Sequence, residues 1–154
     1  AKAMGIRTAM ESMGCAEWRV IEGILPDLDH YLMDIKHMNS EKHRQFTGRG
    51  NGLMLENAKR IAASGMTRLS IRVPVIPGFN HTPEEIGEIA AFADSLPGVE
   101  DIYLLPYHRL GQDKYEGLGR VYELPHILPP EPEYMEMVKR KVETDTGLRC
   151  QIGG

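Results

Sequence analysis

Short apolar segments alternate along this chain with patterns typical of amphipathic helices. The segments that suit strands cover residues 8–11, 30–36, 69–76, 102–105 and 148–152. Strands separated by helices are typical of βαβ units and a parallel sheet. The near-continuous apolar segments also favour strands that are buried on both faces of the sheet. We therefore predict one α/β domain, residues 1–154, built on a parallel sheet.

The helices between these strands are marked by their ends. Apolar residues recur at helical spacing between Asn51, which we expect to cap the helix, and Gly65, which suits the position after its last turn. The next helix begins with a capping box from Thr82 to Glu85, with proline at its first position. A last helix starts near Pro132. Each helix lies between two predicted strands, as a parallel sheet requires.

Composition excludes several classes of protein. Hydrophobic residues make up 42% and charged residues 26%, which is ordinary for a globular domain. A formal net charge of −4 argues against nucleic acid as a partner, and no apolar run approaches the ~20 residues that span a membrane. The two cysteines, Cys15 and Cys150, are far apart, which is typical of reduced thiols in a cytoplasmic protein. Residues 1–5 resemble the end of a helix rather than a signal peptide, so we expect the chain to be a piece of a longer protein.

Asp34 and Lys36 form the sharpest pair of polar residues. They end the second predicted strand, and functional groups gather at the carboxyl ends of parallel strands. Because side chains alternate between the faces of a strand, both residues lie on the same face. A carboxylate beside an ammonium either binds a zwitterion, such as the amino-acid end of a ligand, or forms a structural ion pair.

Other polar residues stand at or within the neighbouring strands. Glu11 and Ser12 end the first strand and either ligate a hard cation or cap the following turn. Arg72 lies inside an apolar strand, so it either pairs with an internal carboxylate or faces a cavity. His108 follows the fourth strand, as a structural residue or as part of a site. It begins a long loop, residues 108–130, of a length that is often functional.

Several short motifs occur in the order found in one enzyme family. They are DIKHM at 34–38, FTG at 46–48, RVPVIPG at 72–78, LLPYHRLG at 104–111, KY at 114–115 and LG at 118–119. Through them the sequence resembles the radical S-adenosylmethionine activating enzymes of glycyl-radical enzymes, the family of pyruvate formate-lyase activating enzyme. The motifs cover nearly the whole chain.

The resemblance implies a fold and an activity. The fold is a parallel-stranded partial (β/α) barrel, about strands three to six of a radical-SAM (β/α)6 barrel. Such enzymes bind a [4Fe-4S] cluster through a CxxxCxxC motif and cleave S-adenosylmethionine reductively. The resulting radical abstracts hydrogen from a backbone glycine of a partner glycyl-radical enzyme. The expected partners are that enzyme and a flavodoxin-type or other electron donor. Neither nucleic acid nor a membrane is expected as a partner.

The resemblance also assigns roles by position. Asp34 and Lys36 match a pair near the methionyl carboxylate of S-adenosylmethionine, and His108 matches a histidine that contacts this cofactor. Glu11 and Ser12 match an Asp-Thr pair near the methionyl amino group. Together with Asp34 they are implied to form a monovalent-cation site. Arg72 matches an interior arginine that faces the substrate peptide.

One departure limits the activity of this chain. The sequence contains neither a CxxxCxxC motif nor the GGEP-type segment that holds the amino group of the cofactor. We therefore expect a fragment from the back of the barrel that is inactive alone. Two alternatives stay open: a barrel aldolase or isomerase that uses Lys36 as a Schiff-base amine, and a non-catalytic interaction module.

Overall fold

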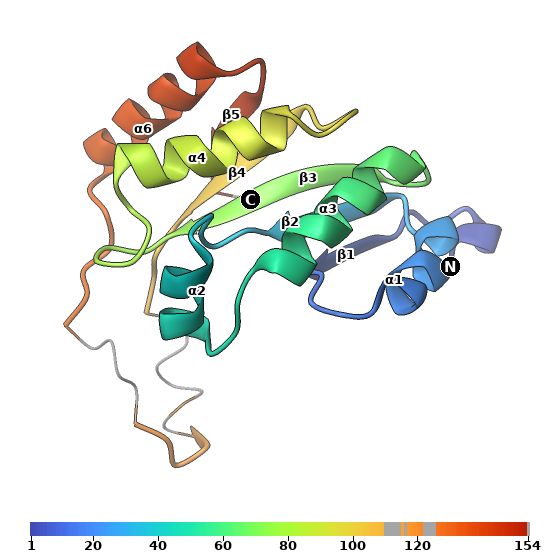
Figure 1. Cartoon of the computed structure of the whole chain (residues 1–154), viewed down its shortest axis with the longest axis horizontal. Helices are drawn as coiled ribbons and strands as arrows, with labels where there is room; N and C mark the ends of the chain where they lie inside the picture. The colour runs from blue at the N-terminus through green and yellow to red at the C-terminus, as the bar shows by residue number, and fades with distance from the viewer. Residues whose placement is uncertain (110–114, 116, 122–125, 154) are drawn as a thin grey trace.

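One parallel sheet organises the chain. The computed structural model describes residues 1–109, 115, 117–121 and 126–153. Its five strands are β1 (Ala9–Ser12), β2 (His30–Asp34), β3 (Arg68–Val75), β4 (Asp101–Pro106) and β5 (Arg149–Ile152). They lie in chain order, and each neighbouring pair is parallel (Figure 1). The predicted α/β fold with a parallel sheet is confirmed.

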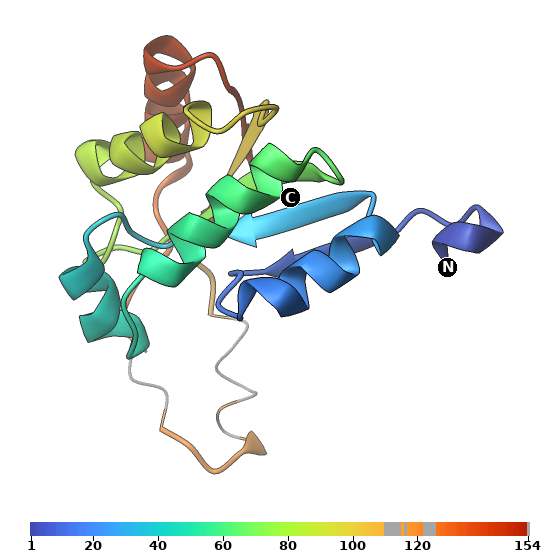
Figure 2. The same ribbon diagram turned by 45° about the vertical axis from the view of Figure 1, so that its right-hand side comes forward.

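Helices connect the strands, and the longest of them cover one face of the sheet (Figures 1 and 2). The helices are α1 (Trp18–Ile24), α2 (Ser40–Thr47), α3 (Gly52–Ser64), α4 (Pro83–Asp94) and α6 (Pro132–Asp145), with short 3-10 helices η1 (Lys2–Met4) and η2 (Leu25–Asp27). None of the described helices is both long and apolar enough to cross a membrane.

The core lies between the helices and alternate side chains of the strands. Tyr31 and Met33 of β2 and Ile71 of β3 are fully buried there. They belong to one cluster with Ile61 of α3 and Ile89 of α4. Burying a Met or Ile side chain of this cluster contributes roughly 1.5–3 kcal/mol, so this interface supplies much of the stability.

The opposite face of the sheet is only half-buried, so the expectation that both faces are buried is wrong for the described residues. Leu32, Asp34, Arg72 and Tyr103 on this face are of intermediate exposure. Crossovers between parallel strands are right-handed, so successive helices of a sheet in chain order pack on the same side. We call this second surface the uncovered face, meaning uncovered by the described helices.

The helix ends follow the sequence signals with one exception. Thr82 and Glu85 form the predicted capping box, and Gly65 takes the left-handed conformation (φ 60°) after α3. Asn51 precedes α3, but its side chain makes no capping hydrogen bond. It donates instead to the carbonyls of His37 and Met38, at 2.8 and 2.7 Å. Those bonds tie the β2–α2 loop to the start of α3.

Gly14 offers a test of the turn after β1. Its φ is 65°, and an added Cβ would lie 2.6 Å from the side chain of Met33. Left-handed backbone costs an L-residue about 1–2 kcal/mol, so we expect Gly14→Ala to lower the free energy of unfolding by at least that amount. Urea denaturation measures the change.

Gly87→Ala is the matched control. Gly87 lies inside α4 with open space around its Cα, so alanine should stabilise the protein by about 0.5–1 kcal/mol. Equal effects of the two substitutions would contradict the conformation of the turn at Gly14.

Candidate functional site

Four of the predicted site residues form one chain of ion pairs on the uncovered face. The register of β2 and β3 sets Asp34 opposite Arg72. Arg72 Nε lies 3.5 Å from Asp34 Oδ1, and Arg72 Nη1 lies 2.6 Å from Glu11 Oε1. Lys36 Nζ donates to Asp34 Oδ2 at 3.0 Å. We call Glu11, Arg72, Asp34 and Lys36 the charged row.

Three members of the charged row are mostly buried, whereas the side chain of Glu11 is 65% exposed. The side chains of Asp34, Lys36 and Arg72 are 26%, 24% and 18% exposed, so these charges are partly desolvated. Asp34 Oδ1 and Arg72 Nε are buried, and neither makes a hydrogen bond to a described residue. Buried polar atoms are normally hydrogen-bonded. The nearest charged partner of each of these two atoms is the other, at 3.5 Å, so the capacity of the row for a charged ligand lies in the exposed parts of the Lys36, Asp34 and Glu11 side chains.

The structure does not bring Ser12 and His108 to the charged row. Ser12 alternates with Glu11 along β1, and its hydroxyl accepts a hydrogen bond from Gly14 N–H. His108 is exposed and lies two residues beyond the end of β4. It makes no hydrogen bond or ion pair with a described residue of the charged row. The cofactor roles of both residues stay predictions.

The predicted cation site has a guanidinium between its carboxylates. Glu11 and Asp34 both contact Arg72, which supplies positive charge where the resemblance implies a metal ion. No group of three or more His, Cys, Asp or Glu residues that could hold a metal occurs in the described part of the chain. The monovalent-cation site therefore stays a prediction.

Neither cysteine belongs to a cluster of metal ligands among the residues that the structure describes. Cys150 of β5 is buried, and burial, reinforced by the charge of Glu143, raises the pKa of its thiol to about 12. A thiol must lose its proton to bind metal, so this environment disfavours Cys150 as a ligand. Cys15 follows β1, which is the edge strand at the opposite end of the sheet from β5.

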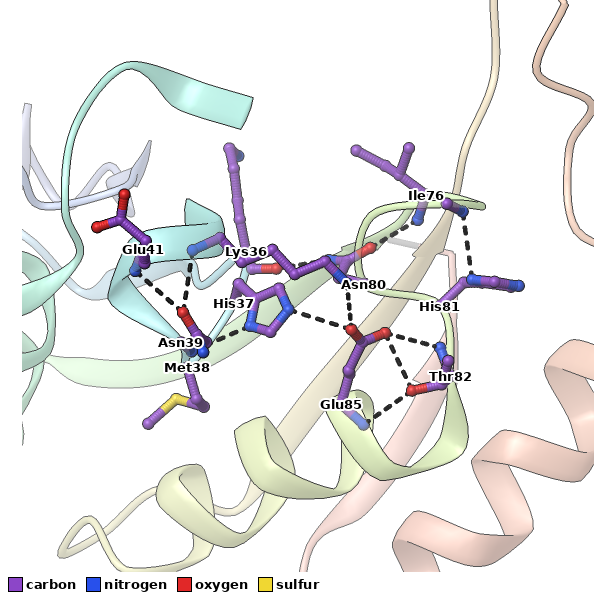
Figure 3. Close-up of polar contacts among 12 residues, drawn as sticks. Lys36, His37, Met38, Asn39, Glu41, Ile76, Asn80, His81, Thr82 and Glu85 are labelled. Carbon is purple, nitrogen blue, oxygen red and sulfur yellow. Dashed lines mark hydrogen bonds and ion pairs between the residues drawn. The ribbon is translucent and has the colours of Figure 1, made fainter. Parts of the chain in front are cut away.

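Buried polar side chains fix the loop that carries Lys36 (Figure 3). His37 is 3% exposed, and its Nδ1 accepts a hydrogen bond from Asn39 N–H at 3.0 Å. The proton of neutral His37 therefore lies on Nε2, 3.2 Å from Glu85 Oε1. Asn80, which is fully buried, donates to the carbonyl of Lys36. Loop β2–α2 is thus tied to the start of α4.

Sequence reasoning missed these supporting residues. The sequence patterns assign Glu85 only to a capping box, and they give Asn80 no role. Their partners lie 48 and 44 residues away in the chain. No periodic pattern reports such contacts. The one local signal is the position of Asn80 in the short turn between the end of β3 and the start of α4.

An apolar cavity of about 380 Å³ adjoins Lys36. The rings of Phe46 from α2 and Phe79 stack at its wall with centroids 4.4 Å apart. Ile76 and Ile127 also line it. A ligand at this end of the sheet would therefore meet charge along the row and apolar surface beyond Lys36.

The Glu85 carboxylate predicts a pH dependence of stability. Burial raises its pKa, but hydrogen bonds from Lys42 and Thr82 outweigh burial and lower the pKa from 4.5 to about 2. This contribution to stability is complete above pH 4.5 and is lost as the pH falls toward 2. Relative to Glu85→Gln, the wild-type free energy of unfolding should fall by up to about 3 kcal/mol across this window.

Urea unfolding at a series of pH values measures this difference. Glu88→Gln, an exposed substitution on the same helix, is the control and should follow the wild-type curve. Parallel curves for wild type and Glu85→Gln would contradict the assigned environment.

The chain is similar in sequence to known proteins. No protein-family model matches the chain. The chain is 40% identical over 151 residues to 4-hydroxyphenylacetate decarboxylase activating enzyme of Clostridioides difficile (strain CD196), covering 97% of this chain and 47% of that protein. The chain thus spans about half the length of the curated relatives it matches.

Solved structures agree with the fold. A domain of pyruvate-formate lyase-activating enzyme from Bacteroides vulgatus superposes with a TM-score of 0.80 at 27% identity, covering 99% of this chain and 84% of that one. A radical SAM methyltransferase from Sphaerobacter thermophilus gives a TM-score of 0.68 at 12% identity, covering 97% of this chain and 41% of that one. The parallel sheet with its helices on one side is thus consistent with part of a radical-SAM barrel.

Proposed function

Because the chain is related over almost its whole length to activating enzymes of glycyl-radical enzymes, we propose that it is part of a radical S-adenosylmethionine enzyme of that kind. The protein that contains it would cleave S-adenosylmethionine reductively and abstract hydrogen from a backbone glycine of a glycyl-radical enzyme. The electron would come from a flavodoxin-type or similar donor, in the cytoplasm.

The observation that carries this proposal is the charged row at the carboxyl ends of β1 and β2, beside Arg72 of β3. The methionyl end of S-adenosylmethionine bears an ammonium and a carboxylate. Lys36 would donate to the carboxylate, and the Asp34 carboxylate, whose side chain is 26% exposed, would accept from the ammonium. Charge-assisted hydrogen bonds of this kind are about twice as strong as neutral ones.

S-adenosylmethionine supplies the deoxyadenosyl radical, and a [4Fe-4S] cluster supplies the electron that cleaves it. The residues described here do not fit the cluster, since the chain holds two cysteines and burial keeps Cys150 protonated. We propose that the cluster ligands lie elsewhere in the protein that contains this chain. The 154-residue chain alone should not cleave S-adenosylmethionine.

The uncovered face would admit the substrate peptide. Arg72 contributes a guanidinium there, half-buried between Glu11 and Asp34. Carbonyl groups of an extended glycine-containing segment are natural acceptors for such a donor. We propose Arg72 as the residue of the charged row that contacts the partner enzyme.

The test uses the full-length protein that contains this chain, reconstituted with iron and sulfide under anaerobic conditions. With S-adenosylmethionine and a reductant it should form 5′-deoxyadenosine, and with its partner enzyme a glycyl radical visible by electron paramagnetic resonance. If a protein that carries its cluster formed no 5′-deoxyadenosine in this reaction, the proposal would be wrong.

Substitutions in the charged row separate cofactor binding from cluster assembly. Asp34→Ala and Lys36→Ala should each weaken binding of S-adenosylmethionine about tenfold or more, because each removes a charged hydrogen bond. The iron content should stay at the wild-type level. Unchanged affinity in both variants, with folding verified by circular dichroism, would remove the assigned roles.

The aldolase alternative has a direct chemical test. A Schiff base requires a free amine, whereas Lys36 donates to Asp34 as an ion pair. Borohydride with carbonyl substrates should therefore leave Lys36 unlabelled. A reduced adduct on Lys36, found by mass spectrometry, would favour the aldolase instead.

A further inference from the structure

The pairing of β2 with β3 is interrupted directly beside Lys36. The last backbone bond between the two strands runs from Ile35 N–H to the carbonyl of Arg72, at 2.9 Å. In a parallel ladder the next bond would come from the N–H of residue 74 to the carbonyl of Ile35. Residue 74 is proline and has no N–H. The ladder therefore ends one residue before Lys36.

The side chain of Asn80 takes the place of the missing ladder. Its Nδ2 donates to the carbonyl of Pro74 at 2.7 Å, and its Oδ1 accepts from Ile76 N–H at 2.8 Å. In a continued ladder, these are the two bonds that the backbone of residue 37 would make to β3. The amide of Asn80 thus acts as a short piece of strand inserted between β2 and β3.

The same amide reaches the backbone of Lys36. Asn80 Nδ2 also donates to the carbonyl of Lys36, at 2.6 Å (Figure 3). Asn80 is fully buried, so water does not compete for these bonds. The following peptide is held separately, because Asn51 donates to the carbonyl of His37. Lys36 is therefore the residue whose position depends on Asn80.

We propose that Asn80 is a positioning residue for S-adenosylmethionine binding. It holds the backbone of Lys36 at the point where Pro74 has ended the ladder, and so fixes the Lys36–Asp34 pair that contacts the methionyl end of the cofactor. This inference rests on the proposed function. Asn80 itself lies behind Lys36 and acts through it, without contacting the cofactor.

A double-mutant cycle distinguishes this role from a general contribution to stability. Residues that act through one another show non-additive effects, whereas independent effects add. In the full-length protein with its cluster, Asn80→Ala should raise the Kd for S-adenosylmethionine at least tenfold, measured by equilibrium dialysis. In a Lys36→Met background the same substitution should change the Kd less than twofold.

Val138→Ala is the matched control for lost stability. Val138 is a buried residue of α6, which packs on α4 and β5 away from the charged row. Val138→Ala should lower the free energy of unfolding, while the Kd for S-adenosylmethionine should change less than twofold in both backgrounds. Asn80→Ser replaces Asn80→Ala if the alanine variant does not fold.

A second readout does not depend on the cofactor. Hydrogen–deuterium exchange of the same full-length variants, followed by mass spectrometry, should speed up in the peptide 35–38 of Asn80→Ala and stay unchanged in the β4 peptide 101–106. In Val138→Ala, exchange at 35–38 should match the wild type.

The two proposals fail in different ways. If the wild-type protein does not bind S-adenosylmethionine, the proposed function is lost, and exchange at 35–38 still decides whether Asn80 holds Lys36. If the wild type binds, equal increases in Kd in both backgrounds would overturn the positioning role of Asn80. Unchanged exchange at 35–38 in Asn80→Ala would overturn it as well.

Discussion

The parallel register of β2 and β3 determines which side chains face the helices and which face the opening. It sets Asp34 opposite Arg72 and sends Tyr31 and Met33 into the core. A slip of one residue would exchange the two sets and place charge against the helices, at a cost of several kcal/mol for each unpaired ion. Burial on one side of the sheet therefore fixes the chemistry on the other.

The site is assembled where the regular pairing stops. Pro74 ends the ladder between β2 and β3, and side chains from later segments take over the backbone groups that are left free. Asn51 and Glu85 secure the β2–α2 loop from α3 and α4 in the same way. Side-chain amides and carboxylates thus hold the backbone of the loop, while the side chain of Lys36 pairs with Asp34 on the charged row.

The sequence predicted those features that depend on local patterns. Alternation along β2 correctly placed Asp34 and Lys36 together, and the capping box at Thr82 was correct because it involves neighbours in the chain. The motifs predicted a resemblance to activating enzymes, which the relatives confirm. The role of Asn80 was beyond these patterns, because its partners are brought to it only by the completed fold. The expected burial of both faces of the sheet was wrong for the described residues, since an apolar strand pattern does not report on which side the crossovers lie.

The central claim is that the charged row binds the methionyl end of S-adenosylmethionine. A crystal structure of the full-length protein with S-adenosylmethionine and its cluster tests this most directly. We expect the methionyl carboxylate within hydrogen-bond distance of Lys36 Nζ and the methionyl ammonium beside the Asp34 carboxylate. A cofactor bound elsewhere, with the ion pairs among Glu11, Arg72, Asp34 and Lys36 unchanged, would contradict it.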